Sequence, residues 1–255
     1  MKTTSFKIRW LDAVGYEINL PGGASIVIDP YLSGNPRAPF QWEQIQGADY
    51  IILTHTHFDH TSDVRNLTVK YNSKIIVEGT AANALAHCFG INYDNIYPVF
   101  PGETYYFEDF VLETSRSKHN IAPQPMPGKG PELVHEMIAA DVPQLDGVGD
   151  QSLLNEYGSL FSLDYYITTK ENMRIMVSSG ALQDSSGRAV YYNAFEHAKS
   201  LPLMLSFARR PDWEHQRIWL RFYPDTMHRF IFHPTMKHLT AIRRNFRIVP
   251  ARTSI

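Results

Sequence analysis

The chain has 255 residues, of which 44% are hydrophobic and 13% aromatic, so it is long enough and apolar enough to bury a substantial core. Its 24 basic and 26 acidic residues nearly balance, which gives no support for nucleic acid or an anionic membrane as a partner. Because Cys88 is the only cysteine and we find neither an apolar signal segment nor an uninterrupted apolar run of about 18 residues, we expect a cytoplasmic protein without a membrane span.

Short apolar runs bounded by turn residues predict a series of strands in the first half of the chain. We expect these strands at 6–11, 15–20, 25–29, 50–53, 74–77, 105–107 and 110–116. The run at 81–89 is typical of a helix, and we expect Thr80 to cap its N-terminus. Cys88 falls in this helix and is interpreted as a core residue.

The second half begins with a different kind of segment. Residues 120–158 contain several prolines and show little regular pattern apart from one or two helical turns at 133–138. Such a long connection within a compact domain is usually functional or disordered, and we expect a lid or a substrate-contacting insertion here. After it we expect a hairpin with strands at 160–168 and 173–178, a strand at 203–207, a helix at 213–222 and a strand at 228–232.

The most informative segment follows the apolar run 50–53 and reads Thr-His-Thr-His-Phe-Asp-His at 54–60. It brings three imidazoles (His55, His57, His60) and the Asp59 carboxylate within six positions. Imidazole and carboxylate are ligands of zinc and related divalent ions. In an extended segment His55 and His57 point to the same side, while Asp59 and His60 turn off that line and could hold a second ion beside the first. We therefore predict a metal site on the loop that leaves this strand, in preference to a histidine-rich surface loop.

This His-x-His-x-Asp-His pattern resembles the signature of the metallo-β-lactamase fold hydrolases, and in particular their UlaG-like branch, the relatives of the ascorbate-phosphate lactonase. The similarity includes the segment 8–15 and the strand and Asp-Pro turn at 26–32, and it is specific over residues 6–120. The resemblance implies an α/β protein with a four-layer αββα sandwich. It also implies that residues 1–255 form a single domain, with the insertion at about 120–158 as a lid.

In the family two ions lie side by side at the sheet edges. The resemblance assigns the first ion to His55, His57 and His119, and the second ion to Asp59, His60 and a late histidine. His233 ends an apolar run and is our first choice for the late histidine, with His238 as an alternative and neither of them as a third possibility. Asp29 is expected to accept a hydrogen bond from a ligating imidazole, although an Asp-Pro pair also occurs as a plain turn.

The chain departs from the family at one position. Relatives with two ions carry a Gly-Asp after a hydrophobic strand, and that carboxylate bridges both ions. Here the corresponding residues read Ser179-Gly180-Ala181, and an alanine cannot bind a metal. Asp184 could substitute for the missing acid. We expect the second ion to bind more weakly than the first, because it lacks an anionic ligand.

The resemblance implies a metal-dependent hydrolase in which a metal-activated hydroxide, oriented by Asp59, attacks a lactone, amide or phosphodiester-type small molecule. Zinc is the expected cofactor, as one or two ions, with manganese or iron as alternatives. Two other classes stay open, namely a catalytically weakened metal-binding protein and, less favoured, a di-iron redox protein. The sequence decides neither the substrate nor the oligomeric state.

Overall fold

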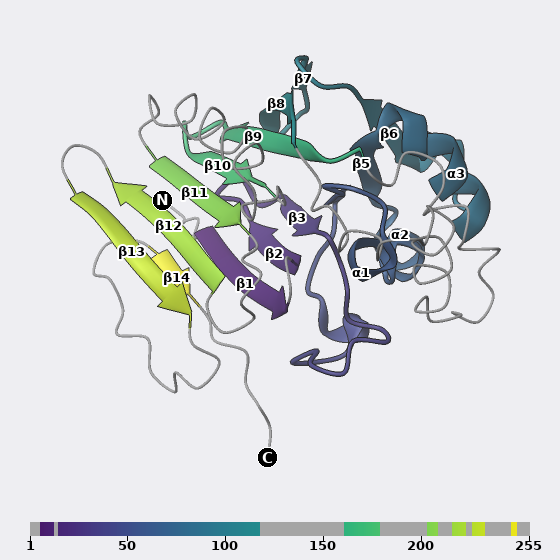
Figure 1. Cartoon of the computed structure of the whole chain (residues 1–255), viewed down its shortest axis with the longest axis horizontal. Coiled ribbons are helices and arrows are strands. Elements are labelled where there is room, and N and C mark those ends of the chain that lie inside the picture. Colours follow the sequence, from purple (N-terminus) through teal and green to yellow (C-terminus); the bar gives the residue numbers. More distant parts are fainter. Residues whose placement is uncertain are drawn as a thin grey trace, which may run out of the picture.

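The computed structural model describes residues 6–12, 15–117 and 161–178 in full, together with the backbone of the strands at 203–208, 216–222, 226–232 and 246–248. These residues form two seven-stranded sheets, A and B (Figure 1). Sheet A contains, in spatial order, β14 (Phe246–Ile248), β1 (Phe6–Asp12), β2 (Gly15–Asn19), β3 (Ser25–Ile28), β4 (Tyr50–Ile52), β5 (Lys74–Glu78) and β6 (Ile96–Val99). Sheet B contains β13 (Thr226–Phe232), β12 (Gln216–Phe222), β11 (Leu203–Ala208), β10 (Arg174–Val177), β9 (Leu163–Thr169), β8 (Phe110–Arg116) and β7 (Thr104–Tyr106).

The two sheets pack face to face around one apolar cluster. Ile28 and Ile52 from sheet A and Tyr165 and Ile167 from sheet B belong to this cluster, and each is fully buried. Burying a side chain of this size stabilises the folded chain by about 1.5–3 kcal/mol relative to leaving it in water. The strands that lead to the candidate site are therefore held in place by the core from one side.

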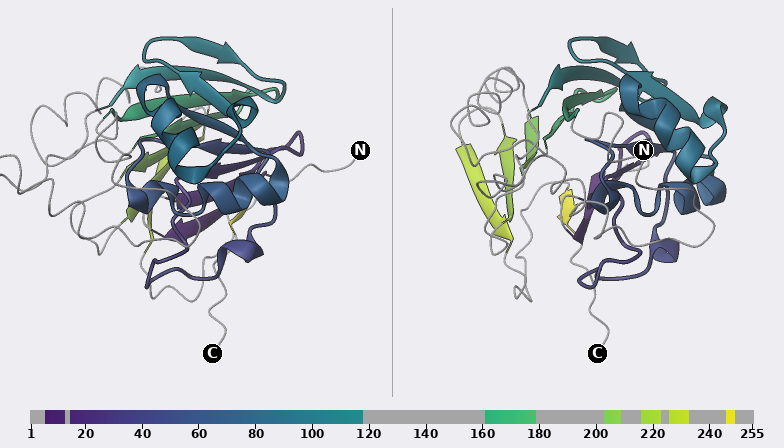
Figure 2. Two further views of the ribbon diagram at one scale, coloured as in Figure 1. Left: turned by 90° about the vertical axis from the view of Figure 1, so that its right-hand side faces the viewer. Right: turned by 45° about the vertical axis from the view of Figure 1, so that its right-hand side comes forward.

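Helices cover the other face of sheet A (Figure 2). The helices are α2 (Val64–Tyr71) and α3 (Gly79–Phe89), and they pack on the outward side chains of β3, β4 and β5. These three strands are parallel neighbours and are buried on both faces, which explains why the sequence shows them as uninterrupted apolar runs. The predicted α/β sandwich is thus present as a helix layer and two sheet layers. The described residues contain no helix on the outer face of sheet B, so the predicted fourth layer falls outside them.

Most of the predicted strands are confirmed, but one predicted helix and one predicted helix cap are wrong. The expected helix at 213–222 is instead strand β12, which pairs with β11 on one side and β13 on the other. The N-cap of α3 is Glu78 and not Thr80, because the Glu78 carboxylate accepts a hydrogen bond from the Thr80 backbone N–H at 2.8 Å. Cys88 is buried in α3, as expected.

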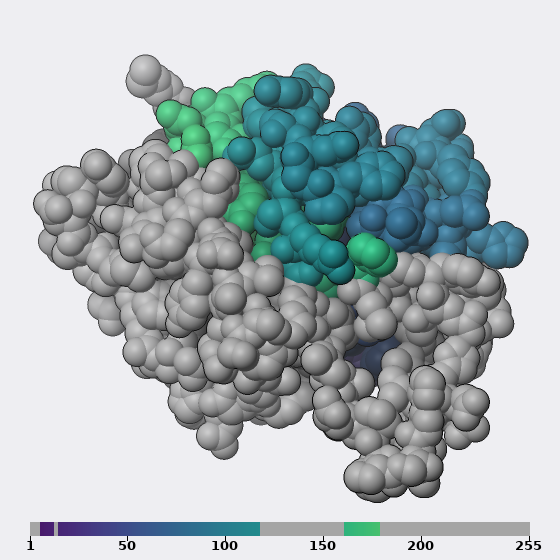
Figure 3. Space-filling model, turned by 45° about the horizontal axis from the view of Figure 1, so that its top comes forward, coloured from purple at the N-terminus to yellow at the C-terminus, as the bar shows by residue number. Residues whose placement is uncertain are grey.

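Several elements were not predicted from the sequence. They are α2, β6, β14, the short helix α1 (Phe58–Thr61) and the two 3-10 turns η1 (Trp42–Gln44) and η2 (Tyr93–Asn95). The predicted insertion at 120–158 lies outside the described residues. In the space-filling view the surface of β7 and β8 adjoins that of residues 161–178, in agreement with the antiparallel pairing of β8 and β9 (Figure 3). None of the helices described is long and apolar enough to cross a membrane.

Candidate metal centre

The candidate site lies where two parallel strands end. Because β3 and β4 are parallel neighbours, the residues that follow them meet at the same edge of sheet A. Asp29 follows β3 directly, and its backbone N–H donates to the carbonyl oxygen of Ile52 at 3.1 Å. Thr54 follows β4 after Leu53. The sheet therefore places Asp29 beside the start of the histidine motif.

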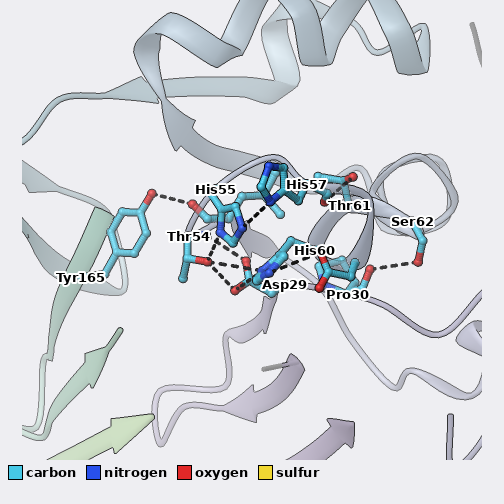
Figure 4. Close-up of polar contacts among 11 residues, drawn as sticks. Asp29, Pro30, Thr54, His55, His57, His60, Thr61, Ser62 and Tyr165 are labelled. Carbon is cyan, nitrogen blue, oxygen red and sulfur yellow. Dashed lines mark hydrogen bonds and ion pairs between the residues drawn. The ribbon is translucent and has the colours of Figure 1, made fainter. Parts of the chain in front are cut away.

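The Asp29 carboxylate is fully buried and accepts three hydrogen bonds (Figure 4). The donors are the Thr54 backbone N–H at 2.8 Å, the Thr54 hydroxyl at 2.7 Å and Nδ1 of His60 at 2.9 Å. These bonds offset the cost of removing a carboxylate from water. The backbone of Asp29 is left-handed, with φ of 43°. Gly15 leaves room for it, since a Cβ at that position would lie 2.9 Å from the Asp29 carbonyl oxygen.

The same network fixes the orientation of two imidazoles. The Thr54 hydroxyl donates its only proton to Asp29, so toward His55 Nδ1, 3.2 Å away, it acts as an acceptor. His55 therefore carries its proton on Nδ1, and His60 does the same because its Nδ1 donates to Asp29. Both rings consequently present the lone pair of Nε2, the form in which neutral imidazole binds metals.

The His57 ring contacts His55 through Nδ1, whereas His55 and His60 use Nδ1 for Thr54 and Asp29. Nδ1 of His57 is 3.2 Å from Nε2 of His55. This distance is that of a hydrogen bond, and it is also close to the roughly 3.4 Å expected between two nitrogen ligands of one tetrahedral ion with bonds of about 2.0–2.1 Å. The prediction that both side chains point to the same side of the segment agrees with this contact.

Asp59 and His60 form a second pair. Oδ1 of Asp59 lies 3.6 Å from Nε2 of His60, which is also a separation that two ligands of one ion can have. The His60 side chain is buried, whereas that of Asp59 is 20% exposed, so the carboxylate reaches the surface of the site. The two residues belong to helix α1, with His57 as N-cap, and not to the loop that the sequence had suggested.

Two hydrogen bonds join sheet B to the motif. The Tyr165 hydroxyl donates to the carbonyl oxygen of Leu53 at 2.7 Å (Figure 4). The Leu163 backbone N–H donates to the carbonyl oxygen of Thr54 at 3.0 Å. Burial and the nearby charge of Asp29 raise the pKa of Tyr165, so its hydroxyl stays protonated and can donate. Both contacts were missed by sequence reasoning, because a residue that lies 112 positions from its partner leaves no local pattern.

The described part of the chain does not complete either predicted ion site. Within it, no group of three or more His, Cys, Asp or Glu side chains is arranged to hold one ion. Each predicted site has two of its ligands here, and the third ligands, His119 and His233, lie outside the described residues, as do His238, Ala181 and Asp184. The structure therefore brings together His55 with His57 and Asp59 with His60.

Comparison with known proteins decides the family. The sequence model of the metallo-beta-lactamase superfamily matches residues 11–138, which is half of the chain and includes the whole histidine motif. The chain belongs to the metallo-β-lactamase superfamily. The finer assignment to its UlaG-like branch stays a prediction.

Relatives within this superfamily match shorter stretches. A UPF0173 metal-dependent hydrolase of Roseiflexus castenholzii is 42% identical over 72 residues, which cover 27% of this chain and 30% of that protein. A protein of the same description from Sulfurisphaera tokodaii is 28% identical over 167 residues, which cover 63% of this chain and 70% of that protein. In the first case the match spans less than a third of the relative's length.

Solved structures of the superfamily are more distant. The isothiocyanate hydrolase from Delia radicum gut bacteria has 16% sequence identity and a TM-score of 0.46, with 79% of this chain and 69% of that chain covered. A likeness at this level adds nothing to the family assignment. The assignment therefore rests on the sequence match, and the arrangement of the two sheets agrees with it.

Proposed function

We propose that this member of the metallo-β-lactamase superfamily is a metal-dependent hydrolase of a small molecule. The observation that carries the proposal is the pair of imidazoles whose Nδ1 atoms contact the Asp29 carboxylate and the Thr54 hydroxyl. An imidazole held in this way offers Nε2 to a metal without first changing its tautomer. The relatives from Roseiflexus castenholzii and Sulfurisphaera tokodaii are described as metal-dependent hydrolases, which supports the same activity here.

The donor atoms present fit divalent zinc. We propose that Nε2 of His55 and Nδ1 of His57 hold the first ion together with His119, and that Asp59 and His60 hold the second together with His233. Nitrogen and carboxylate oxygen donors suit zinc, and they also suit manganese and iron, which remain alternatives for the metal. Asp29 would not bind the ion itself; it would orient the His60 ring through its hydrogen bond to Nδ1.

The chain's own residues then serve a hydrolytic reaction. When bound, such an ion lowers the pKa of a water to about 7 and polarises an electrophilic oxygen. Asp59 is partly exposed, so its carboxylate can accept a hydrogen bond from the attacking water and orient it toward the substrate. Tyr165 and Leu163 keep the motif at a fixed distance from sheet B. A lactone, amide or phosphodiester would provide the electrophilic centre.

Domain organisation and location are further parts of the proposal. We propose a single domain over residues 1–255, in which the segment at about 120–158 contacts the substrate. The buried single cysteine agrees with a reducing cytoplasm. The near balance of charges makes a small molecule a better candidate for the ligand than nucleic acid.

Two other functions compete with this one. A catalytically weakened metal-binding protein is favoured by Ala181, which stands where relatives carry a bridging acid. A di-iron redox protein would need that acid even more, so it ranks last. The hydrolase is favoured over both because Asp59 is present and reaches the surface of the site.

Elemental analysis of freshly purified protein and a panel of esters, lactones, amides and phosphodiesters would test the proposal. We expect one to two transition-metal ions per chain, and we expect that replacing both His55 and His57 by alanine removes the first ion and the turnover. His87→Ala is the matched control, because His87 is exposed on α3 and outside the motif. Purified protein that contains no metal would refute the metal site. Protein that contains metal but turns over no compound of the panel would favour the catalytically weakened metal-binding protein. Bound iron together with oxygen reduction would favour the di-iron redox protein.

A further inference from the structure

A buried carboxylate in sheet B lies outside the candidate metal centre. Asp164 belongs to β9 and is fully buried, and among the described residues neither of its oxygens has a hydrogen-bond partner. No positively charged group in this part of the chain contributes to its pKa. A buried charge is normally paired or bound to a metal ion, because its removal from water is costly. The unpartnered carboxylate therefore indicates a group that binds there.

Serine side chains gather around this carboxylate on one face of sheet B. The antiparallel register of β9 and β10, continued by one pair, places Ser178 opposite Asp164. On the other side Asp164 lies opposite Ser115 of β8, and one step further the Ser117 backbone N–H donates to the Ser162 carbonyl oxygen at 2.8 Å. Residues two apart in a strand share a face, so Ser117 and Ser162 lie on the face of Asp164. Ser117, Ser162 and Ser178 are all buried.

The hydroxyls of these serines lie near the carboxylate without hydrogen-bonding to it. Those of Ser178 and Ser117 lower the pKa of Asp164, so they are close enough to favour its charged form. In the described part of the chain the Ser117 and Ser162 hydroxyls are themselves buried and without a partner. Oxygen ligands about 2.4 Å from one cation and at right angles lie about 3.4 Å apart, which is longer than a usual hydrogen bond between oxygens. Buried oxygens that are close but not bonded to each other are thus arranged as cation ligands are.

The donor atoms and their charge indicate the kind of ion. All of them are oxygens, which hard cations prefer, whereas zinc is usually held by nitrogen or sulfur as well. Asp164 supplies one negative charge and the hydroxyls supply none. A monovalent ion neutralises this charge, but a divalent ion would leave a positive charge buried.

We propose that the Asp164 carboxylate and the hydroxyls of Ser117, Ser162 and Ser178 bind a monovalent alkali cation, Na⁺ or K⁺. The ion supplies the positive charge that the buried carboxylate lacks. This site is separate from the candidate metal centre, and it does not depend on the proposed hydrolase activity.

The site lies at the end of sheet B that holds the histidine motif. The two neighbours of Asp164 in β9 are Leu163 and Tyr165, which donate the hydrogen bonds to the residues that follow β4. β8, β9 and β10 are adjacent in sheet B (Figure 1). An ion bound to all three strands would hold this end of the sheet together, so it would act as a structural cofactor.

Urea unfolding at pH 8 tests the site, because the pKa of Asp164 is about 6 and the carboxylate is charged at this pH. The zinc-loaded protein is unfolded at constant ionic strength while tetramethylammonium chloride is replaced stepwise by NaCl or KCl. We expect the unfolding midpoint to rise and then to saturate. At a cation concentration of 100 times Kd the unfolding equilibrium constant should fall about 100-fold. The salt that acts at the lower concentration identifies the preferred ion.

Variants separate this site from a general effect of salt. Asp164→Asn should lose the response, and Ser162→Ala should shift it to higher concentrations. With tetramethylammonium as the only cation, Asp164→Asn should be more stable than the wild type, and saturating Na⁺ or K⁺ should remove this advantage. Glu171→Gln is the matched control, since it removes an exposed carboxylate from the turn of the same hairpin. It should respond as the wild type does.

The protein in which both His55 and His57 are replaced by alanine should also keep the response, because these residues belong to the other site. Loss of the response in this variant would place the ion at the metal centre and overturn the proposal. Equal responses in the wild type and Asp164→Asn, or no response in the wild type, would overturn it too. Stabilisation by CaCl₂ alone would refute the assignment to a monovalent ion.

Discussion

Asp164 is a carboxylate whose removal should make the protein more stable. It is the second residue of β9, is fully buried, and lies on the opposite face of sheet B from Tyr165. Burial raises the pKa of Asp164 from 3.8 to about 6, although the hydroxyls of Ser178 and Ser117 act in the opposite sense. The folded protein therefore binds a proton at this position more tightly than the unfolded chain does.

The size and sign of the effect follow from linkage. Because the pKa is higher in the folded state, the stabilising contribution of the protonated carboxyl is complete below about pH 3.8 and is lost as the pH rises to about 6. A shift of about two units corresponds to about 3 kcal/mol at neutral pH. Asn is isosteric with the protonated carboxyl and does not titrate, so Asp164→Asn should avoid this loss.

Urea unfolding of the wild type and of Asp164→Asn at matched pH values between 4 and 8 would measure the effect. We expect nearly equal free energies of unfolding at pH 4, and a variant that is more stable by up to about 3 kcal/mol at pH 8. Asp94→Asn, at an exposed position in η2, is the control that removes the same charge from the surface. A difference between wild type and Asp164→Asn that stays constant over this pH range, or a less stable variant at pH 8, would refute the reasoning.

Three further predictions concern the metal centre. Asp59→Asn should lower the hydrolytic rate about 100-fold or more, because the side chain orients water at the surface of the site, while the thermal unfolding midpoint barely changes. A variant that keeps most of its rate would contradict that role. Thr54→Val should weaken binding of the first ion by about 10–100-fold, measured by competition with a chelator, since His55 loses the acceptor for its Nδ1 proton; unchanged affinity would refute the tautomer assignment. Titration of metal-free protein should show two separated binding steps, and Ala181→Asp should strengthen the weaker one; two equally tight steps in the wild type would point to another bridging residue, such as Asp184.

The sequence predicts the first half of the fold well because its strands are uninterrupted apolar runs. β3, β4 and β5 are buried on both faces, so their composition alone separates them from the turns. The sequence predicts a helix in place of strand β12, since Arg217 to Phe222 mixes charged and apolar residues without a clear period of two. Its pairing with β11 and β13 decides the conformation, and pairing with distant strands cannot be read from a local window.

Some residues of the candidate site can be predicted from the sequence and others cannot. His55, His57, Asp59 and His60 could be found because they are adjacent in the chain and of ligand type. Thr54 is also in the motif, but its role depends on Asp29, which lies 25 positions away. A hydroxyl next to a histidine is too common to be informative until the parallel pairing of β3 and β4 is known. The roles of His119 and His233 stay predictions, because both lie outside the described residues.

The two hydrogen bonds from Leu163 and Tyr165 to the residues that follow β4 hold the two sheets together at this edge. A fluctuation that parted the sheets here would have to break both bonds at once and expose part of the shared core, so such openings belong to global unfolding and not to local breathing. The Leu163 amide should therefore be among the slowest to exchange its hydrogen with solvent. The segment that carries His55 and His57 should therefore keep its position whether or not an ion is bound.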